Sequence, residues 1–161
     1  MNVSKELITE IFAECLSRQI KIVTVESCTG GLISSALTNF PGSSAVFDRG
    51  FVTYSNQSKC DLIGVRKNLI ESHGAVSQEV VTEMALNPVK FDKENIITIA
   101  ISGVAGPNSS ENKPVGLVWL ASFKENHLLT KELRLGPIGR EEIRNIGTRE
   151  ALNLLLENLK C

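Results

Sequence analysis

The sequence lacks the features that mark membrane, secreted and nucleic-acid-binding proteins. Its most apolar run is residues 96–101, whereas a membrane-spanning helix needs about twenty apolar residues. The first residues contain no basic region followed by an apolar signal core. The 17 Lys and Arg residues and 18 Asp and Glu residues leave a formal net charge of −1, without the basic excess that phosphate backbones require. We therefore expect a cytoplasmic protein with no membrane or nucleic-acid partner.

Cysteine and histidine are sparse, which argues against a metal centre. The four cysteines, at positions 15, 28, 60 and 161, form no CxxC pair. The two histidines, His73 and His127, lie far apart in the sequence, so no zinc-ligand spacing is present. We expect no metal site, and scattered thiols of this kind are typical of a reducing compartment.

What the sequence does contain is an alternation of short β-branched runs and amphipathic segments. Helices are predicted over residues 4–18, 32–38, 77–86 and 140–159, with a further short helix through Lys59 that Gly64 ends. Strands are predicted over residues 20–25, 46–54, 95–102, 115–123 and 128–135, the last two joined by a hairpin turn at Glu125 and Asn126. This order predicts a single domain over residues 1–161, with a three-layer α/β fold and a mixed sheet.

Three segments directly follow predicted strands: ESCTGG (26–31), YSNQSK (54–59) and SGVAGP (102–107). Sites in open α/β sheets form at the carboxyl ends of strands, where loops lead into helices. These segments are therefore where we look for the chemistry. SGVAGP could offer N–H groups to an anion, although it is no Walker motif.

Ser27 lies just past a strand and just before Gly30 and Gly31 at the start of a helix. Free N–H groups and the helix dipole favour an oxyanion there, which suits a nucleophilic serine. Taken alone, however, the motif is more typical of a helix cap made by Ser27 or Thr29. Cys28 is a rival nucleophile, because thiolates at helix N-termini are activated, but neither histidine has a catalytic context.

Tyr54 and Lys59 form the second candidate group. If a helix begins near Ser55, Lys59 lies one turn in and can point back to the same edge of the sheet as Ser27. A lysine can serve as general base for a serine, provided that burial lowers its pKa from about 10.4. Judged singly, it is more typical of a solvated surface lysine. Glu26 is either a site carboxylate or a structural partner for a buried N–H.

Six stretches together resemble one known family, the C-terminal domain of the competence/damage-inducible protein CinA. They occur in the family's order and cover nearly the whole chain: VESCTGGLISSALTNFPGSS (25–44), GFVTYSNQSK (50–59), HGAVS (73–77), SGVAGP (102–107), KPVG (113–116) and REEIR (140–144). Stand-alone members of the family are nicotinamide-nucleotide amidases, and members often form homodimers. The resemblance implies a three-layer α/β/α sandwich with a mixed sheet.

The resemblance also implies an activity and a set of roles. The expected reaction is hydrolysis of nicotinamide mononucleotide to nicotinate mononucleotide and ammonia, without metal or organic cofactor. Ser27 is the expected nucleophile, activated by Tyr54 and Lys59. Backbone N–H groups around Thr29, Gly30 and Gly31 are expected to form the oxyanion hole. Gly103, Gly106 and Arg140 are expected to hold the nucleotide.

Three segments depart from the family pattern, and we expect all three to lie near ligand-facing loops. Arg49-Gly50 replaces a glycine pair, residues 108–112 replace a glycine-rich loop, and Ile138-Gly139-Arg140 lacks the family's aspartate. The catalytic motifs are intact, so these departures bear on substrate fit. They leave two alternatives open: a catalytically silent nucleotide-binding or regulatory module, and a hydrolase of a different small amide.

Overall fold

The computed structural model describes residues 3–90 and 94–161, and its centre is one mixed sheet with the strand order β2-β1-β3-β4-β5. β1 (Lys21–Glu26) pairs in parallel with β2 (Phe47–Val52) and with β3 (Ile96–Gly103). β4 (Leu117–Lys124) and β5 (His127–Arg134) continue the sheet as an antiparallel hairpin. The predicted mixed sheet is therefore confirmed, as is the two-residue hairpin turn between β4 and β5.

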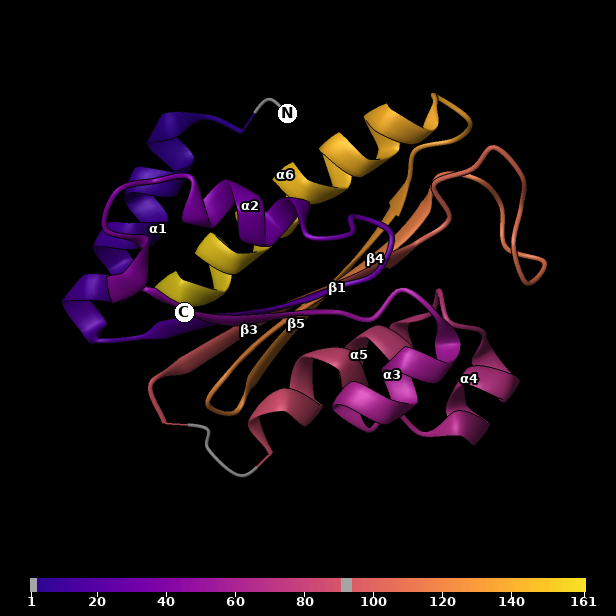
Figure 1. Cartoon of the computed structure of the whole chain (residues 1–161), viewed down its shortest axis with the longest axis horizontal. Helices are drawn as coiled ribbons and strands as arrows, with labels where there is room; N and C mark the ends of the chain where they lie inside the picture. The colour runs from indigo at the N-terminus through magenta and orange to yellow at the C-terminus, as the bar shows by residue number, and fades with distance from the viewer. Residues whose placement is uncertain (1–2, 91–93) are drawn as a thin grey trace.

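Helices cover both faces of this sheet and complete the predicted three-layer α/β/α sandwich (Figure 1). One face carries α1 (Lys5–Arg18), α2 (Leu32–Thr38) and α6 (Arg140–Lys160). The other carries α3 (Asn56–Ile63), α4 (Lys67–His73) and α5 (Gln78–Leu86). Single 3₁₀ turns occur at Ser43–Ala45 and Asn87–Val89. No helix in the described part of the chain has the length and apolarity needed to cross a bilayer.

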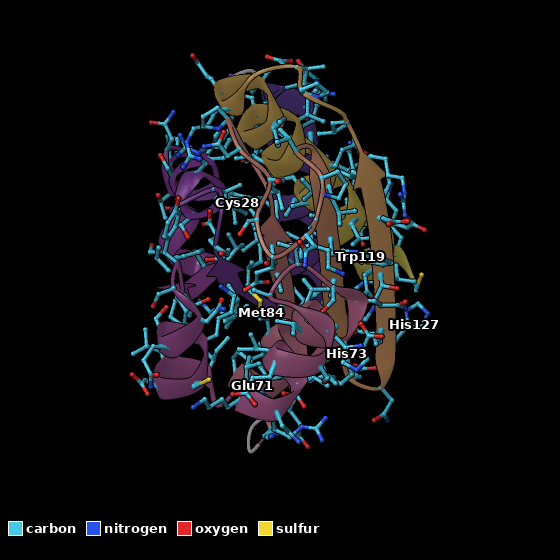
Figure 2. All side chains as sticks on the ribbon, turned by 90° about the vertical axis from the view of Figure 1, so that its right-hand side faces the viewer. Cys28, Glu71, His73, Met84, Trp119 and His127 are labelled. Carbon is cyan, nitrogen blue, oxygen red and sulfur yellow. The ribbon has the colours of Figure 1, made fainter. Side chains whose placement is uncertain are left out.

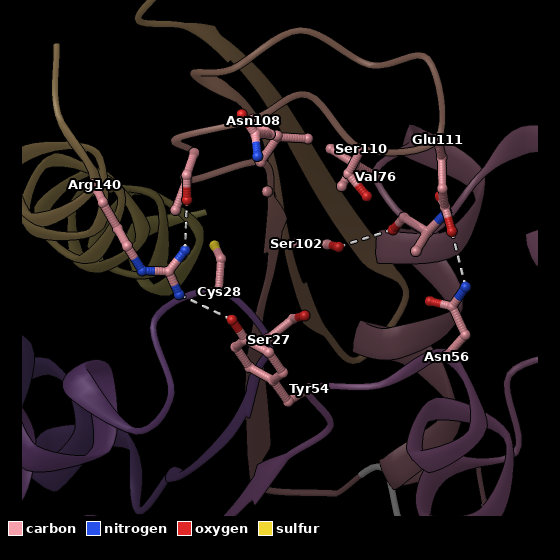
Figure 3. A pocket seen from close by; sticks show the side chains of 15 residues that line it. Ser27, Cys28, Tyr54, Asn56, Val76, Ser102, Asn108, Ser110, Glu111 and Arg140 are labelled. Carbon is pink, nitrogen blue, oxygen red and sulfur yellow. Dashed lines mark hydrogen bonds between the residues drawn. The ribbon is translucent and has the colours of Figure 1, made fainter. Parts of the chain in front are cut away.

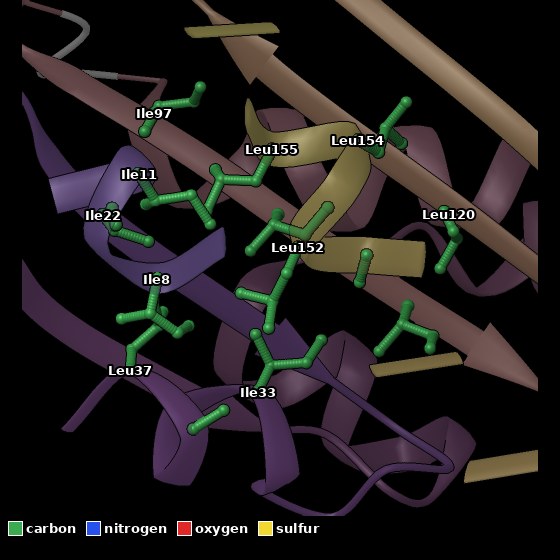
Figure 4. Packing of buried hydrophobic residues seen from close by; sticks show 14 of the residues in the cluster. Ile8, Ile11, Ile22, Ile33, Leu37, Ile97, Leu120, Leu152, Leu154 and Leu155 are labelled. Carbon is green, nitrogen blue, oxygen red and sulfur yellow. The ribbon is translucent and has the colours of Figure 1, made fainter. Parts of the chain in front are cut away.

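Each face of the sheet has its own apolar core, because alternate strand residues point to opposite sides. On the α1–α6 side, Ile97 of β3 packs among the buried side chains of Ile8, Leu152 and Leu155 (Figure 4). On the α5 side, Ala100 of β3 belongs to a second cluster that includes Val25, Val80, Val81 and Met84. Strands covered on both faces are apolar along their whole length, which explains the β-branched runs read from the sequence.

The helix α4 is the element that the sequence did not predict. Gly74 is the residue that ends α4. The segment KNLIESH places a single buried side chain, Ile70, against the protein. One apolar residue gives no helical periodicity, so tertiary packing rather than pattern determines this helix.

The parallel strands bring the expected site segments together. The carboxyl ends of β1, β2 and β3 lie at Glu26, Val52 and Gly103, and the register pairs Glu26 with both Val52 and Ile101. The loops that follow these ends therefore start from one edge of the sheet. This placement is what the rule for sites in α/β sheets predicts.

Candidate active site

Ser27, directly after the carboxyl end of β1, is in contact with Lys59 of α3. The Nζ of Lys59 lies 3.1 Å from the Oγ of Ser27. Ser27 is only 7% exposed and Lys59 only 1%. A buried serine–lysine contact at this distance is the arrangement in which a lysine can take the proton of a serine hydroxyl. The solvated surface position that is typical of a lysine judged singly is therefore wrong for Lys59.

The start of α3 delivers Lys59 to this position. Ser55 caps the helix, its Oγ accepting a hydrogen bond of 3.0 Å from the N–H of Ser58. Lys59 lies one turn further on, and its Nζ donates to the carbonyl of Thr53 at 2.8 Å. Thr53 is in turn held beside β1, because its N–H donates to the carbonyl of Glu26. The amine is thus positioned by backbone rather than by a second flexible side chain.

The environment of Lys59 favours its neutral form. Burial lowers the pKa of Lys59 to about 8, against opposing effects from Cys28, Glu111 and Cys60. At pH 7 a group with such a pKa is roughly one-tenth neutral, compared with well under a thousandth for an ordinary lysine. Lys59 can serve as a general base only if burial lowers its pKa, and burial does lower it.

Glu26 is structural, which resolves the two roles left open for it. Its carboxylate is fully buried and accepts N–H bonds from Gly31, Ile33 and Ser34 at 2.8–3.1 Å. It also accepts the hydroxyl of Ser34 at 2.8 Å. Glu26 therefore caps α2 from the end of β1 and folds the loop that presents Ser27. It takes the capping role that the sequence assigned to Ser27 or Thr29.

The glycine loop uses some of the N–H groups expected to bind an oxyanion. The N–H of Gly31 donates to Glu26, and the N–H of Gly30 donates to the carbonyl of Ser27 at 3.0 Å. Within the described residues, the N–H of Thr29 has no such acceptor, and its buried hydroxyl oxygen also has no partner. Of the three groups predicted for the oxyanion hole, Thr29 is thus the one that remains available.

A pocket of about 210 Å³ opens above Ser27 (Figure 3). Arg140, the first residue of α6, forms one wall of it. Its guanidinium donates to the hydroxyl of Tyr54 at 2.9 Å and to the carbonyl of Gly106 at 2.8 Å. The lining also includes Gly103, where an added Cβ would lie 2.9 Å from Val118 and 3.0 Å from the sulfur of Cys28. The structure therefore brings Ser27, Tyr54, Gly103, Gly106 and Arg140 to one pocket.

Tyr54 and Cys28 also lie in the pocket, but neither is placed to react in place of Ser27. Tyr54 is 59% exposed and bonds to Arg140, not to Ser27 or Lys59. Cys28 lines the pocket, but burial raises the pKa of its thiol to about 12. Neither His73 nor His127 lies beside Cys28 (Figure 2). A protonated thiol without a histidine is a poor nucleophile, so the geometry favours Ser27 over Cys28.

Several residues of the site lie in segments that the sequence analysis names, but it assigns them no role. Arg144 of α6 donates to the carbonyls of Cys28 and Thr29, both at 3.0 Å, and fixes the nucleophile loop from the far end of the chain. Asn56 and Glu111 line the pocket and hydrogen-bond to each other at 2.8 Å. Of the three departures from the family pattern, Arg49 and Ile138 lie outside the pocket lining, whereas residues 108–112 contribute Asn108, Ser110 and Glu111 to it.

The described part of the chain contains no cluster of candidate metal ligands. Across residues 3–90 and 94–161, no three His, Cys, Asp or Glu side chains are placed to hold a metal ion. The chemistry that the described side chains can perform is nucleophilic attack by a serine with a lysine as general base.

The sequence matches the model of the CinA C-terminal domain over residues 4–159. The chain belongs to this family. The nicotinamide-nucleotide amidohydrolase PncC of Escherichia coli K12 is 43% identical over 142 residues, which are 86% of this chain and 84% of PncC. A putative competence-damage inducible protein of Clostridium botulinum strain Langeland is 44% identical over 153 residues. This match covers 94% of this chain and 37% of the clostridial protein, so the chain spans well under half the length of such relatives.

Solved structures of the family share the fold along the whole chain. The competence damage-inducible protein A of Klebsiella pneumoniae superposes with a TM-score of 0.91 at 33% identity, covering 99% of this chain and 98% of that one. The competence/damage inducible protein CihA of Agrobacterium tumefaciens gives a TM-score of 0.88 at 39% identity, covering 100% and 99%. The family resemblance and the fold predicted from the sequence are both confirmed.

Proposed function

We propose that this chain is an amidohydrolase that converts nicotinamide mononucleotide into nicotinate mononucleotide and ammonia. The observation that carries the proposal is the buried contact of 3.1 Å between Lys59 Nζ and Ser27 Oγ. The choice of substrate is supported by the similarity to the E. coli protein named nicotinamide-nucleotide amidohydrolase.

In the first half of the proposed reaction, the neutral amine of Lys59 accepts the hydroxyl proton of Ser27. Ser27 Oγ attacks the carboxamide carbon and forms a tetrahedral intermediate. The negative oxygen of this intermediate would be stabilised by N–H donors near Thr29. Lys59 then returns its proton to the amide nitrogen as the C–N bond breaks, so that ammonia leaves and Ser27 carries a nicotinoyl ester.

In the second half, water replaces ammonia. Lys59 takes a proton from the water as its oxygen attacks the ester, and then protonates Ser27 Oγ as the acyl group leaves as the carboxylic acid, whose remaining proton passes to the released ammonia. The sum is amide plus water giving carboxylate plus ammonium, with no oxidant or cofactor. Tyr54 is proposed to relay protons to the leaving ammonia, and its bond to Arg140 would orient its hydroxyl at the mouth of the pocket. Gly103 and Gly106 would allow the nucleotide to approach the backbone.

The proposal is tested by incubating the purified protein, and Ser27→Ala beside it, with nicotinamide mononucleotide. We expect equal amounts of nicotinate mononucleotide and ammonia from the wild type, and a loss of at least about a thousandfold in Ser27→Ala. Circular dichroism should show that the variant is folded. A folded wild type that releases no ammonia would refute the amidase and favour the nucleotide-binding module.

A second candidate is a hydrolase of a different small amide, favoured by the altered loop 108–112 in the pocket wall. A panel of small carboxamides separates the two, because the second candidate predicts Ser27-dependent ammonia from another amide and little from the nucleotide.

We also propose that the protein is a cytoplasmic homodimer. Sedimentation equilibrium of the purified protein tests the stoichiometry.

A further inference from the structure

Two of the side chains that line the pocket carry formal charges, and they occupy opposite walls. Arg140 lies on one side, bonded to Tyr54 and Gly106, and Glu111 lies on the other (Figure 3). The proposed mechanism uses the guanidinium side but assigns nothing to the carboxylate. A carboxylate in the lining of a pocket that contains the proposed nucleophile calls for a substrate group that it can complement.

The carboxylate of Glu111 is held in place by two hydrogen bonds. One oxygen accepts the side-chain amide of Asn56 at 2.8 Å, and the other accepts the N–H of Ala75 at 2.7 Å. These donors come from the start of α3 and from the segment before α5. Glu111 itself has a positive φ of 50°, a conformation that few non-glycine residues adopt. The loop is therefore fixed so that this carboxylate is oriented before any substrate arrives.

The charge of Glu111 reaches the reaction centre. Burial lowers the pKa of Lys59 to about 8, and the negative charge of Glu111 acts in the opposite direction. An electrostatic effect on the amine that contacts Ser27 means that a substrate group bound between them also lies in this field.

The chemistry of the proposed substrate supplies the complementary group. In nicotinamide mononucleotide the ring nitrogen bears the ribose and is a quaternary pyridinium cation. This nitrogen is separated by one ring carbon from the carbon that carries the carboxamide, so a carboxamide held at Ser27 keeps the cation within the same pocket. Building on the proposed function, we propose that Glu111 recognises the pyridinium cation and makes the site prefer positively charged pyridine carboxamides to neutral ones.

Two ligands that differ only at the ring test this inference: nicotinamide mononucleotide and its 1,4-dihydro form. Both have the same carboxamide, ribose and phosphate, but the reduced ring is neutral. Binding is measured by calorimetry in Ser27→Ala, so that no turnover occurs. We expect this variant to bind the oxidised nucleotide about five- to tenfold more tightly than the reduced one. Adding Glu111→Gln should remove that preference and change the Kd of the reduced nucleotide by less than about twofold.

Glu71→Gln in the same Ser27→Ala background is the matched control. Glu71 and Glu111 both line a neighbouring hollow, but Glu71 is outside the pocket that contains Ser27. It should leave the preference intact. An equal loss of affinity for both nucleotides in Glu111→Gln would mean that Glu111 only orders the loop, and an unchanged preference would mean that it does not sense the cation. Either result overturns the inference, whereas the absence of ammonia release by the wild type would overturn the proposed function alone.

Discussion

Lys59 carries an amine into the interior of the protein and has a small set of neighbours there. Its Nζ contacts Ser27 Oγ and the Thr53 carbonyl, and the groups that act on its charge are Cys28, Glu111 and Cys60. Burial outweighs all three of these and lowers the pKa to about 8. The residue is thus neutral often enough to act as a base, yet protonated often enough to return a proton.

We therefore predict that kcat/KM for nicotinamide mononucleotide rises with pH and levels off above an apparent pKa near 8, the value given by burial of Lys59. The sign follows from the mechanism, because only the neutral amine can accept the proton of Ser27. Initial rates between pH 6 and 9.5 give the profile. The substrate phosphate titrates near pH 6 and so cannot produce a limb near 8. A rate that stays flat from pH 6.5 to 9 would argue against Lys59 as the base.

The helix α6 acts as a clamp on the nucleophile loop. Its Arg144 reaches the carbonyls of Cys28 and Thr29, while Arg140 at its first turn holds Tyr54 and Gly106. Ile143 and Leu152 anchor this helix in the apolar core, so the contacts of its two arginines tie the pocket to that core. The geometry of the proposed active site therefore depends on an element more than a hundred residues from Ser27.

Removing the clamp should slow the reaction without removing any reacting group. We expect Arg144→Ala to lower kcat by about 10- to 100-fold, because the loop bearing Ser27 loses two charge-assisted bonds and its alignment with Lys59. Arg144→Lys should recover only part of this, since an ammonium lacks the planar fork that reaches two carbonyls. Steady-state kinetics with Arg149→Ala as control test this, because the ion pair of Arg149 is to Glu150 in its own helix. A kcat near that of the wild type in Arg144→Ala would show that the loop bearing Ser27 keeps its alignment with Lys59 without Arg144.

These contacts also show where the sequence is informative. The β-branched runs and the amphipathic segments predict the strands and every helix except α4 to within a residue or two, because both signals are local. The convergence of Ser27 and Lys59 could be anticipated from parallel strands ending at one edge. The roles of Arg144 and Glu111 could not, because each depends on a contact between segments distant in sequence. The role of Glu26 was ambiguous in the sequence, because a buried glutamate after a strand can either cap a helix or take part in catalysis.

Burial of the Lys59 amine lowers the free energy of unfolding of the whole molecule at neutral pH. Apolar clusters on both faces of the sheet stabilise the fold, and the site at the strand ends is where a lysine is buried against this trend. The pKa of Lys59 is about 8 in the folded state and its ordinary value is 10.5. The unfolded chain therefore binds the proton more tightly, and this residue makes the free energy of unfolding rise as pH increases from about 8 to 10.5. Below that window its contribution is unfavourable.

Replacing Lys59 by methionine should accordingly make the protein more stable and inactive at once. Methionine has a similar length and no charge to desolvate, although it leaves the Thr53 carbonyl without its donor. We expect the free energy of unfolding at pH 7 to increase by about 1–2 kcal/mol in Lys59→Met, and the difference from the wild type to shrink by pH 10. Urea denaturation at both pH values measures this, with the exposed Lys160→Met as control. A less stable Lys59→Met at pH 7 would mean that the hydrogen bonds of the amine outweigh its desolvation. Burial of Lys59 would then not lower the free energy of unfolding.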